Sequence, residues 1–446
     1  MPAGLGVTIG SANAVAVTTM RDRPDNPTVL RRAATVRLHD DNTTRLHEDS
    51  TAELGNGTGR SGFTGFVDRV GDPVGILSAD GTSWSGEDLT ATAVSCLVHA
   101  SLPHAAVTVT RPATWPEHSV DALRGALDRI GLREAMLMPE PVAAVHWLDA
   151  VHGPLGDGIV VVYDLGASSL DVAVLRTGAE PEMLGRPLSS VELSGDMLDH
   201  LVTTHVLDAV GDATGNLDVF DPVVVDALAE LRARCRAAKE ELSADTEVVV
   251  AVELPGVRRD VRLVRDEVED LARGPVRDSL ALISEALRTA DIDPSDVSRV
   301  LLVGGGSSIP IVAESISFCL GLPVTASAHP ADTAATGAGI VSVRSLTAPG
   351  AVVTAPDPTL PVEDAITTEL SVVPPPPGDR AAFAVGEPVE PQRSKARKFT
   401  LIGAAAVAIV IVTGGGLAVG TLTTSAGAES TRSSTVVTPS APTTAG

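Results

Sequence analysis

Two glycine- and serine-rich turns, far apart in the chain, contain residue types suited to phosphate binding. In Gly4–Val17 an apolar run is followed by a turn at Gly10–Asn13 and then by a second β-rich run. The segment Val160–Leu175 repeats this plan around a turn at Gly166–Ser169. A tight turn between two strands can point its main-chain N–H groups at a phosphate. Two such hairpins facing each other across a cleft would hold a polyphosphate from both sides.

A third loop offers related chemistry. The segment Val303–Pro310 follows an apolar run and contains Gly304, Gly305 and Gly306. Glycines let the backbone approach a ligand closely, and the N-terminus of the helix expected next favours an anion or the dipolar edge of a nucleotide. One such loop is a weak signal of a binding site, whereas three in order are a much stronger one.

The elements that must position these loops form an α/β pattern over residues 1 to about 345. Valine-rich apolar runs predict buried strands at Ala106–Thr110, Ile159–Tyr163 and Val300–Val303. Helical spacing predicts helices at Asp121–Ile130, Val225–Leu242 and Val276–Ala290.

Composition restricts the function. The chain has 446 residues, of which 44% are hydrophobic, so a large core can form. Acidic residues outnumber basic ones by 57 to 33, the net charge is −24, and aromatic residues make up only 2%. A nucleic-acid partner is therefore not expected, because it requires a basic face and stacking side chains. The separated cysteines Cys96, Cys235 and Cys319 form no paired motif and suit a reducing compartment.

The C-terminal part predicts a membrane anchor. Residues 346–398 read as an acidic, proline-rich linker that ends in the basic cluster Arg393–Lys398. Residues 399–422 carry no charge and are long enough to cross a lipid bilayer as one helix. Residues 423–446 read as a disordered Ser/Thr/Pro-rich tail. With no cleavable signal at the N-terminus, the positive-inside rule predicts a cytoplasmic body and an extracytoplasmic tail.

Seven segments, in this order along the chain, resemble motifs of the ATPase domain of 70-kDa heat-shock (DnaK-type) chaperones, within the actin/hexokinase superfamily. They are the first turn, Val107–Trp115, Glu140–Ala144, Asp164–Asp171, Ser194–Asp199, Cys235–Ser243 and Val303–Pro310. The resemblance covers roughly residues 4–345 and implies two lobes, each a mixed sheet with flanking helices, with ATP in the cleft between them. Residues 1–155 would form the first lobe and 156–345 the second, with 196–275 as its outer subdomain.

The resemblance also implies roles for individual residues. Glu140, Asp164 and Asp171 would organise Mg²⁺ and the attacking water, with Asp164 and Asp171 beside the metal, and Ser169 keeps the hydroxyl of a loop threonine. ATP or ADP would contact a larger set, namely Gly10, Ser11, Ala12, Asn13, Gly166, Ala167, Ser168, Gly195, Lys239, Ser243, Gly304, Gly305, Gly306 and Ser308.

The chain departs from the family pattern at both ends of this site. Thr8 replaces an aspartate of the metal shell, and no lysine precedes Lys239, so the lysine that contacts the transferred phosphate is missing; Arg69 lies near its place. Arg236 replaces the ribose-binding glutamate, while Glu240 and Ser308 replace two arginines that stack on adenine. Loss of one preorganised charge at the phosphate commonly costs roughly 10²–10³ in rate, so we expect slow hydrolysis.

Three functions remain open from the sequence. The first is a membrane-anchored chaperone-type ATPase or nucleotide sensor without a peptide-binding domain, acting on a protein client or co-chaperone. The second is a catalytically impaired scaffold that binds a protein partner. The third is an actin-like polymer or a small-molecule kinase of the same superfamily.

Overall fold

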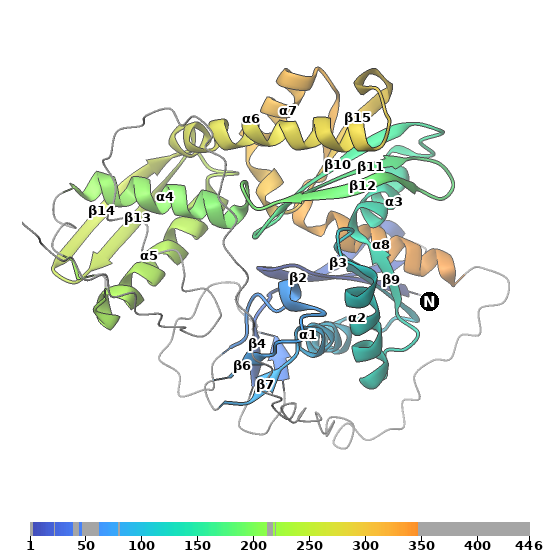
Figure 1. Cartoon of the computed structure of the whole chain (residues 1–446), viewed down its shortest axis with the longest axis horizontal. Coiled ribbons are helices and arrows are strands. Elements are labelled where there is room, and N and C mark those ends of the chain that lie inside the picture. The colour runs from blue at the N-terminus through green and yellow to red at the C-terminus, as the bar shows by residue number, and fades with distance from the viewer. Residues whose placement is uncertain are drawn as a thin grey trace, which may run out of the picture. The chain divides into compact units, whose positions relative to one another are not determined.

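The computed structural model describes residues 3–21, 23–38, 44–46, 62–78, 81–211, 217–218 and 220–346. Within them the chain forms two lobes, each built on a five-stranded mixed sheet (Figure 1). The predicted α/β class with two lobes is therefore confirmed. The predicted membrane span 399–422 and tail 423–446, and the linker 346–398 beyond its first residue, lie outside the described residues. None of the described helices combines the length and apolar character needed to traverse a bilayer.

The two large sheets share one topology. The first has the order β3-β2-β1-β8-β9, and the second has the order β12-β11-β10-β15-β16. In each, an antiparallel hairpin (β1–β2 or β10–β11) is extended by one antiparallel strand on one side and by two parallel strands on the other. The internal duplication that the sequence suggested is therefore a duplication of whole sheets.

The strands of the first sheet are β1 (Ala3–Ile9), β2 (Asn13–Met20), β3 (Arg23–Ala33), β8 (Ala106–Arg111) and β9 (Met136–Pro139). Those of the second are β10 (Ile159–Leu165), β11 (Leu170–Arg176), β12 (Glu182–Ser190), β15 (Val297–Val303) and β16 (Val324–Ala326). The central strands β1 and β10 are buried along nearly their whole length, which explains their continuous apolar runs. Short pairs β4 (Val36–Leu38) with β5 (Thr44–Leu46), and β6 (Ile76–Leu77) with β7 (Ser83–Trp84), lie beside the first lobe.

Helices cover both sheets. α1 (Gly86–Ala100) and α2 (Glu117–Arg129) pack in the first lobe, and α6 (Arg265–Thr289) and α7 (Pro310–Leu320) pack in the second. An outer subdomain combines α4 (Gly195–Val210), α5 (Pro222–Glu241), β13 (Glu247–Leu254) and β14 (Val257–Val264) around a core of its own (Figure 1).

α6 begins eleven positions before the predicted start at Val276. Pro275 lies inside the helix and removes one main-chain hydrogen bond. Val268, Ala272, Val276 and Leu280 nevertheless form a buried stripe at helical spacing on both sides of the proline. Their packing keeps the segment helical across Pro275, although a proline usually ends a helix.

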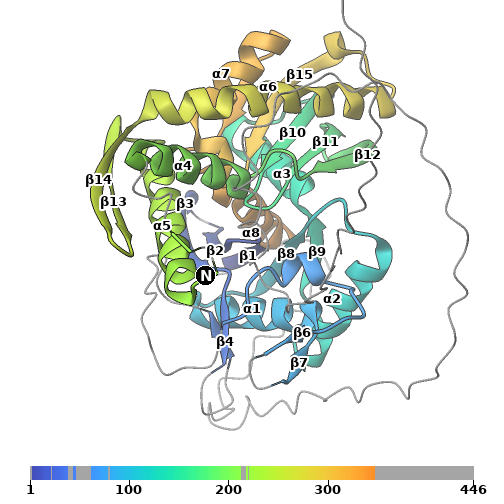
Figure 2. The same cartoon turned by 60° about the vertical axis from the view of Figure 1, so that its left-hand side comes forward.

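Two helices cross between the lobes. α3 (Glu140–His152) follows the first sheet but packs Ala144, Val145 and Leu148 against the second. α8 (Thr333–Ser345) follows the second sheet but packs on β1 of the first, where a Cβ on Gly6 would lie 2.0 Å from the Ala335 carbonyl oxygen. The backbones of α3 and α8 also meet, and Figure 2 shows α8 between the two sheets. Each lobe therefore holds a helix that continues from the other.

Candidate functional site

One cavity of about 350 Å³ gathers the loops that the sequence singled out. Its walls come from the ends of β1, β10 and β15, the start of α4 and one face of α5. Every predicted catalytic and cofactor-binding residue, from Gly10 in the first turn to Ser308 in the third loop, lines this cavity. The structure thus brings together the full predicted set, from both lobes.

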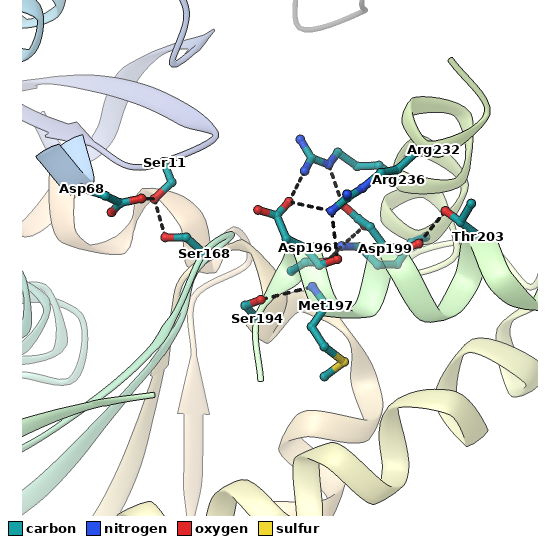
Figure 3. Close-up of polar contacts among 12 residues, drawn as sticks. Ser11, Asp68, Ser168, Ser194, Asp196, Met197, Asp199, Thr203, Arg232 and Arg236 are labelled. Atoms are coloured by element: carbon teal, nitrogen blue, oxygen red, sulfur yellow. Dashed lines mark hydrogen bonds and ion pairs between the residues drawn. The ribbon is translucent and has the colours of Figure 1, made fainter. Parts of the chain in front are cut away.

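The two predicted turns lie opposite each other. The Gly10 amide donates to the Asn13 carbonyl at 2.8 Å, and the Gly166 amide donates to the Ser169 carbonyl at 2.9 Å, so each turn closes its hairpin. Among the described residues, the amides at 11, 12, 167 and 168 donate to no backbone carbonyl. The turns touch directly, because the Ser11 and Ser168 hydroxyls are 2.6 Å apart (Figure 3). Unused amides on two facing turns are suited to phosphate oxygens.

Three carboxyl groups crowd beside the second turn. Asp164 and Asp171 are direct cross-strand partners in the β10–β11 hairpin, and Glu140 begins α3. Burial, and then repulsion from Asp171, raises the pKa of Asp164 to about 7. Burial also raises the pKa of Asp171, and burial together with repulsion from Asp164 and Asp171 raises that of Glu140 well above its usual range. Such a cluster is unfavourable unless a cation or protons neutralise it.

The donor set fits a hydrated magnesium ion. Within the described part of the chain, Asp171 Oδ1 is buried and has no hydrogen-bond partner, so it is available to a metal or to metal-bound water. No three His, Cys, Asp or Glu side chains of the described residues converge closely enough to ligate one ion. Magnesium typically retains water and uses one or two carboxylates plus substrate phosphates, which this arrangement allows.

The third loop packs tightly against the second turn. Gly304 has φ +81°, and a Cβ there would lie 2.4 Å from both Asp164 Oδ1 and the Leu165 carbonyl oxygen. Only glycine combines this backbone conformation with this approach. The start of α4 docks on the same turn, since the Gly195 amide donates to the Gly166 carbonyl at 2.9 Å and the Asp196 amide to that of Ala167 at 2.8 Å. The loops are thereby fixed relative to the carboxylates.

One face of α5 carries an ion-pair network beside the start of α4. Asp199, fully buried on α4, pairs with Arg236 Nε at 2.6 Å (Figure 3). It also pairs with Lys239 Nζ at 2.5 Å. Lys239 also donates to the Gly195 carbonyl at 3.1 Å, and Arg236 also pairs with Asp196. Lys239, predicted as a nucleoside contact, thus joins α5 to α4, and the network leaves neither cation without an anionic partner.

Asp68 lines the cavity, although it was not among the site residues predicted from the sequence. The 3₁₀ turn η1 (Val67–Arg69) points Asp68, and not its neighbour Arg69, into the cavity. Arg69 turns away to Asp72 at 2.7 Å and to the Val74 carbonyl at 3.0 Å. Thr8 lines the cavity as expected from its place in β1, and Thr110 Oγ1 donates to its hydroxyl at 2.8 Å. Only the turn geometry separates Asp68 from Arg69, and no sequence pattern indicated it.

Comparison with known proteins identifies the class. The family model for Hsp70 protein matches residues 87–347, more than half of the chain, and the chain therefore belongs to the Hsp70 family. Its ATPase domain is actin-like and two-lobed, which agrees with the two sheets and their flanking helices.

Two HscA chaperones give the scale of the likeness. The chain is 31% identical over 234 residues to the "Chaperone protein HscA homolog" of Burkholderia mallei (strain SAVP1) and 30% identical over 236 residues to the "Chaperone protein HscA" of Salmonella arizonae. Each match covers 52% of this chain and 36% of the relative. The chain thus matches little more than a third of each relative's length.

Proposed function

We propose that this protein is a chaperone-type nucleotide-binding protein that holds ATP or ADP with Mg²⁺ in the cavity and hydrolyses ATP slowly. Membership of the Hsp70 family supports nucleotide binding. The observation that carries the proposal is the convergence of two facing turns and a glycine loop on one cavity beside the buried, unpartnered Asp171 Oδ1. Main-chain amides that can bind phosphate and carboxylates that can bind a cation are together suited to a nucleotide–Mg²⁺ complex.

Different residues of the cavity would bind the phosphates, orient the metal ion and handle the proton. The amides at 11, 12, 167 and 168 would bind phosphate oxygens, and Asp164 and Asp171 would orient the hydrated ion, which neutralises phosphate charge when bound. Glu140, whose pKa is raised by burial, would hold or accept a proton near the attacking water. Slow turnover is expected because the basic side chains that line the cavity, among the described residues, are Arg236 and Lys239, and both already pair with carboxylates.

Titration calorimetry of the full chain with Mg-ATP and Mg-ADP tests the binding, and single-turnover hydrolysis tests the chemistry. We expect saturable binding of both nucleotides. Hydrolysis should fall by about 10²–10³ in Glu140→Gln and in Asp171→Asn, while Asp121→Asn, an exposed carboxylate on α2, leaves it unchanged. Hydrolysis that persists in both variants would rule out the catalytic roles proposed for Glu140 and Asp171. Binding without any turnover would favour the scaffold function instead.

We also propose, from the sequence alone, that residues 399–422 anchor the protein in a membrane with its body in the cytoplasm. The support is the long uncharged stretch preceded by a basic cluster. Cell fractionation compares the full chain with a variant lacking residues 399–422. The full chain should sediment with membranes and resist carbonate extraction, whereas the deleted variant should not. Equal distribution of the two would reject the anchor.

We further propose that the bound nucleotide changes the relative orientation of the lobes and that a client or co-chaperone recognises this change. The support is that the residues lining the cavity come from both lobes, so a ligand can favour one arrangement over another only through contacts on both sides. Hydrogen exchange with and without Mg-ADP should show protection spreading to α3 and α8, which cross between the lobes. Protection confined to the turns would argue against coupling.

A further inference from the structure

Asp68 lies where both phosphate-binding turns meet. The Ser11 hydroxyl donates to Asp68 Oδ2 at 3.5 Å and contacts the Ser168 hydroxyl at 2.6 Å, so one carboxylate from the first lobe stands beside turns from both lobes (Figure 3). Burial raises the pKa of Asp68, and hydrogen bonds from Ser11 and Ser168 counteract that rise. The Asp68 carboxylate is thus directed toward both turns while its side chain stays partly exposed to solvent.

The charge around Asp68 is one-sided. Asp68, Glu140, Asp164 and Asp171 all line the cavity beside the two turns, and among the described residues the basic ones in its lining are Arg236 and Lys239. Both basic residues pair with Asp199, and Arg236 also pairs with Asp196, so each already has a carboxylate partner of its own. Arg69, next to Asp68 in the chain, points away from the cavity.

This excess of negative side chains affects the binding of nucleoside diphosphates and triphosphates differently. The magnesium complex of a nucleoside triphosphate carries one more negative charge than that of the diphosphate, and the γ-phosphate bears it. Between facing turns, the γ-phosphate would lie within a few ångströms of Asp68, and no unpaired basic side chain of the described cavity lining would compensate for the repulsion. At such separations and at the screening typical of protein sites, repulsion between unit charges changes affinity by roughly tenfold or more.

Resting on the proposed function, we propose that Asp68 is a specificity-determining residue that makes this cavity select nucleoside diphosphate over triphosphate. At equal concentrations the diphosphate then occupies the cavity roughly ten times as often as the triphosphate, and the triphosphate predominates only above roughly a tenfold excess. The main-chain amides supply phosphate affinity, and Asp68 sets how many phosphates are accepted.

Calorimetry of the full chain with Mg-ADP and with the magnesium complex of a non-hydrolysable β,γ-imido triphosphate tests this. In the wild type we expect the diphosphate to bind roughly tenfold more tightly. Asp68→Asn keeps the shape of the side chain and removes its charge. It should raise triphosphate affinity about tenfold and change diphosphate affinity less than threefold. Asp121→Asn, exposed on α2, is the matched control and should change neither, and thermal melting verifies that each variant is folded.

Three results would overturn the inference while leaving the proposed function intact. They are equal or tighter triphosphate binding in the wild type, equal changes for both ligands in Asp68→Asn, and weaker triphosphate binding in that variant. The last would mean that Asp68 holds a cation against the γ-phosphate. Absence of binding by either nucleotide would reject the proposed function itself, and the selectivity with it.

Discussion

The Asp164→Asn substitution should stabilise the magnesium-free protein at alkaline pH. Asp164 and Asp171 face each other across one hairpin, and burial, then repulsion from Asp171, raises the pKa of Asp164 from an ordinary 3.8 to about 7. The folded state therefore binds this proton more tightly than the unfolded chain does. Below about pH 4, Asp164 is protonated in both states and does not change the free energy of unfolding. This free energy falls as pH rises from about 4 to 7, and it stays lowered above about pH 7.

The pKa values set the size of the effect. A rise from 3.8 to about 7 corresponds to a cost of about 4 kcal/mol to the folded state above pH 7, and about 2 kcal/mol at pH 5. For a folded body of roughly 340 residues the unfolding entropy is about 0.7 kcal/mol per kelvin. Removing the charge should therefore raise the melting temperature by up to about 6 °C at pH 8, and by less than half of that at pH 5.

Differential scanning calorimetry in a chelating buffer, with wild type and Asp121→Asn as references, measures this difference. Excess Mg²⁺ should reverse the order, because the substitution removes an anionic oxygen that would face the ion. A variant that melts at or below the wild-type temperature at pH 8 without metal, yet is folded by circular dichroism, would refute the reasoning. It would mean that Asp164 makes favourable contacts that outweigh its repulsion.

Four further substitutions follow from the packing. Lys239→Met should lower the free energy of unfolding by about 3–5 kcal/mol in urea titrations, because it leaves the fully buried Asp199 short of one of its cationic partners. Gly337→Ala should destabilise by more than about 2 kcal/mol, since its Cβ would meet the backbone of α3 at 1.7 Å, whereas Gly125→Ala on open α2 should stabilise by up to about 1 kcal/mol in the same assay. Gly304→Ala should abolish calorimetric nucleotide binding, and retention of wild-type affinity would show that the third loop adjusts freely.

The sequence predicted the repeated parts of this fold well. The hairpins at Gly4–Val17 and Val160–Leu175 have unbroken apolar runs and glycine turns, and both appear as β-hairpins at the predicted places. The buried strands predicted at Ala106–Thr110 and Val300–Val303 also form, as parts of β8 and β15, and the structure pairs them in parallel with β1 and β10. The early start of α5 also had a signal in Asp221 followed by Pro222, an N-cap and a first-turn proline, and the Asp221 carboxylate accepts from the Val223 amide at 2.9 Å.

What the sequence could not predict depends on side-chain direction. Asp68 and Arg69 are neighbours on a 3₁₀ turn, so one residue of register decides whether a carboxylate or a guanidinium enters the cavity. Lys239 has the right position for a nucleoside contact, yet its partner Asp199 lies forty positions earlier and becomes visible only when α4 and α5 pack. Pro275 marks a helix end locally, and only the long buried stripe of α6 overrides it.

The exchange of α3 and α8 between the lobes has a mechanical consequence. Each sheet carries a helix whose chain continues into the opposite sheet, and the two helices cross at a glycine with no room for a methyl group. Translation of one sheet away from the other would separate α3 and α8 from the apolar side chains against which they pack. Rotation about the crossing point leaves those cores intact. We therefore expect any relative motion of the lobes to be a rotation about the helix contact at Gly337, and not a separation of the sheets.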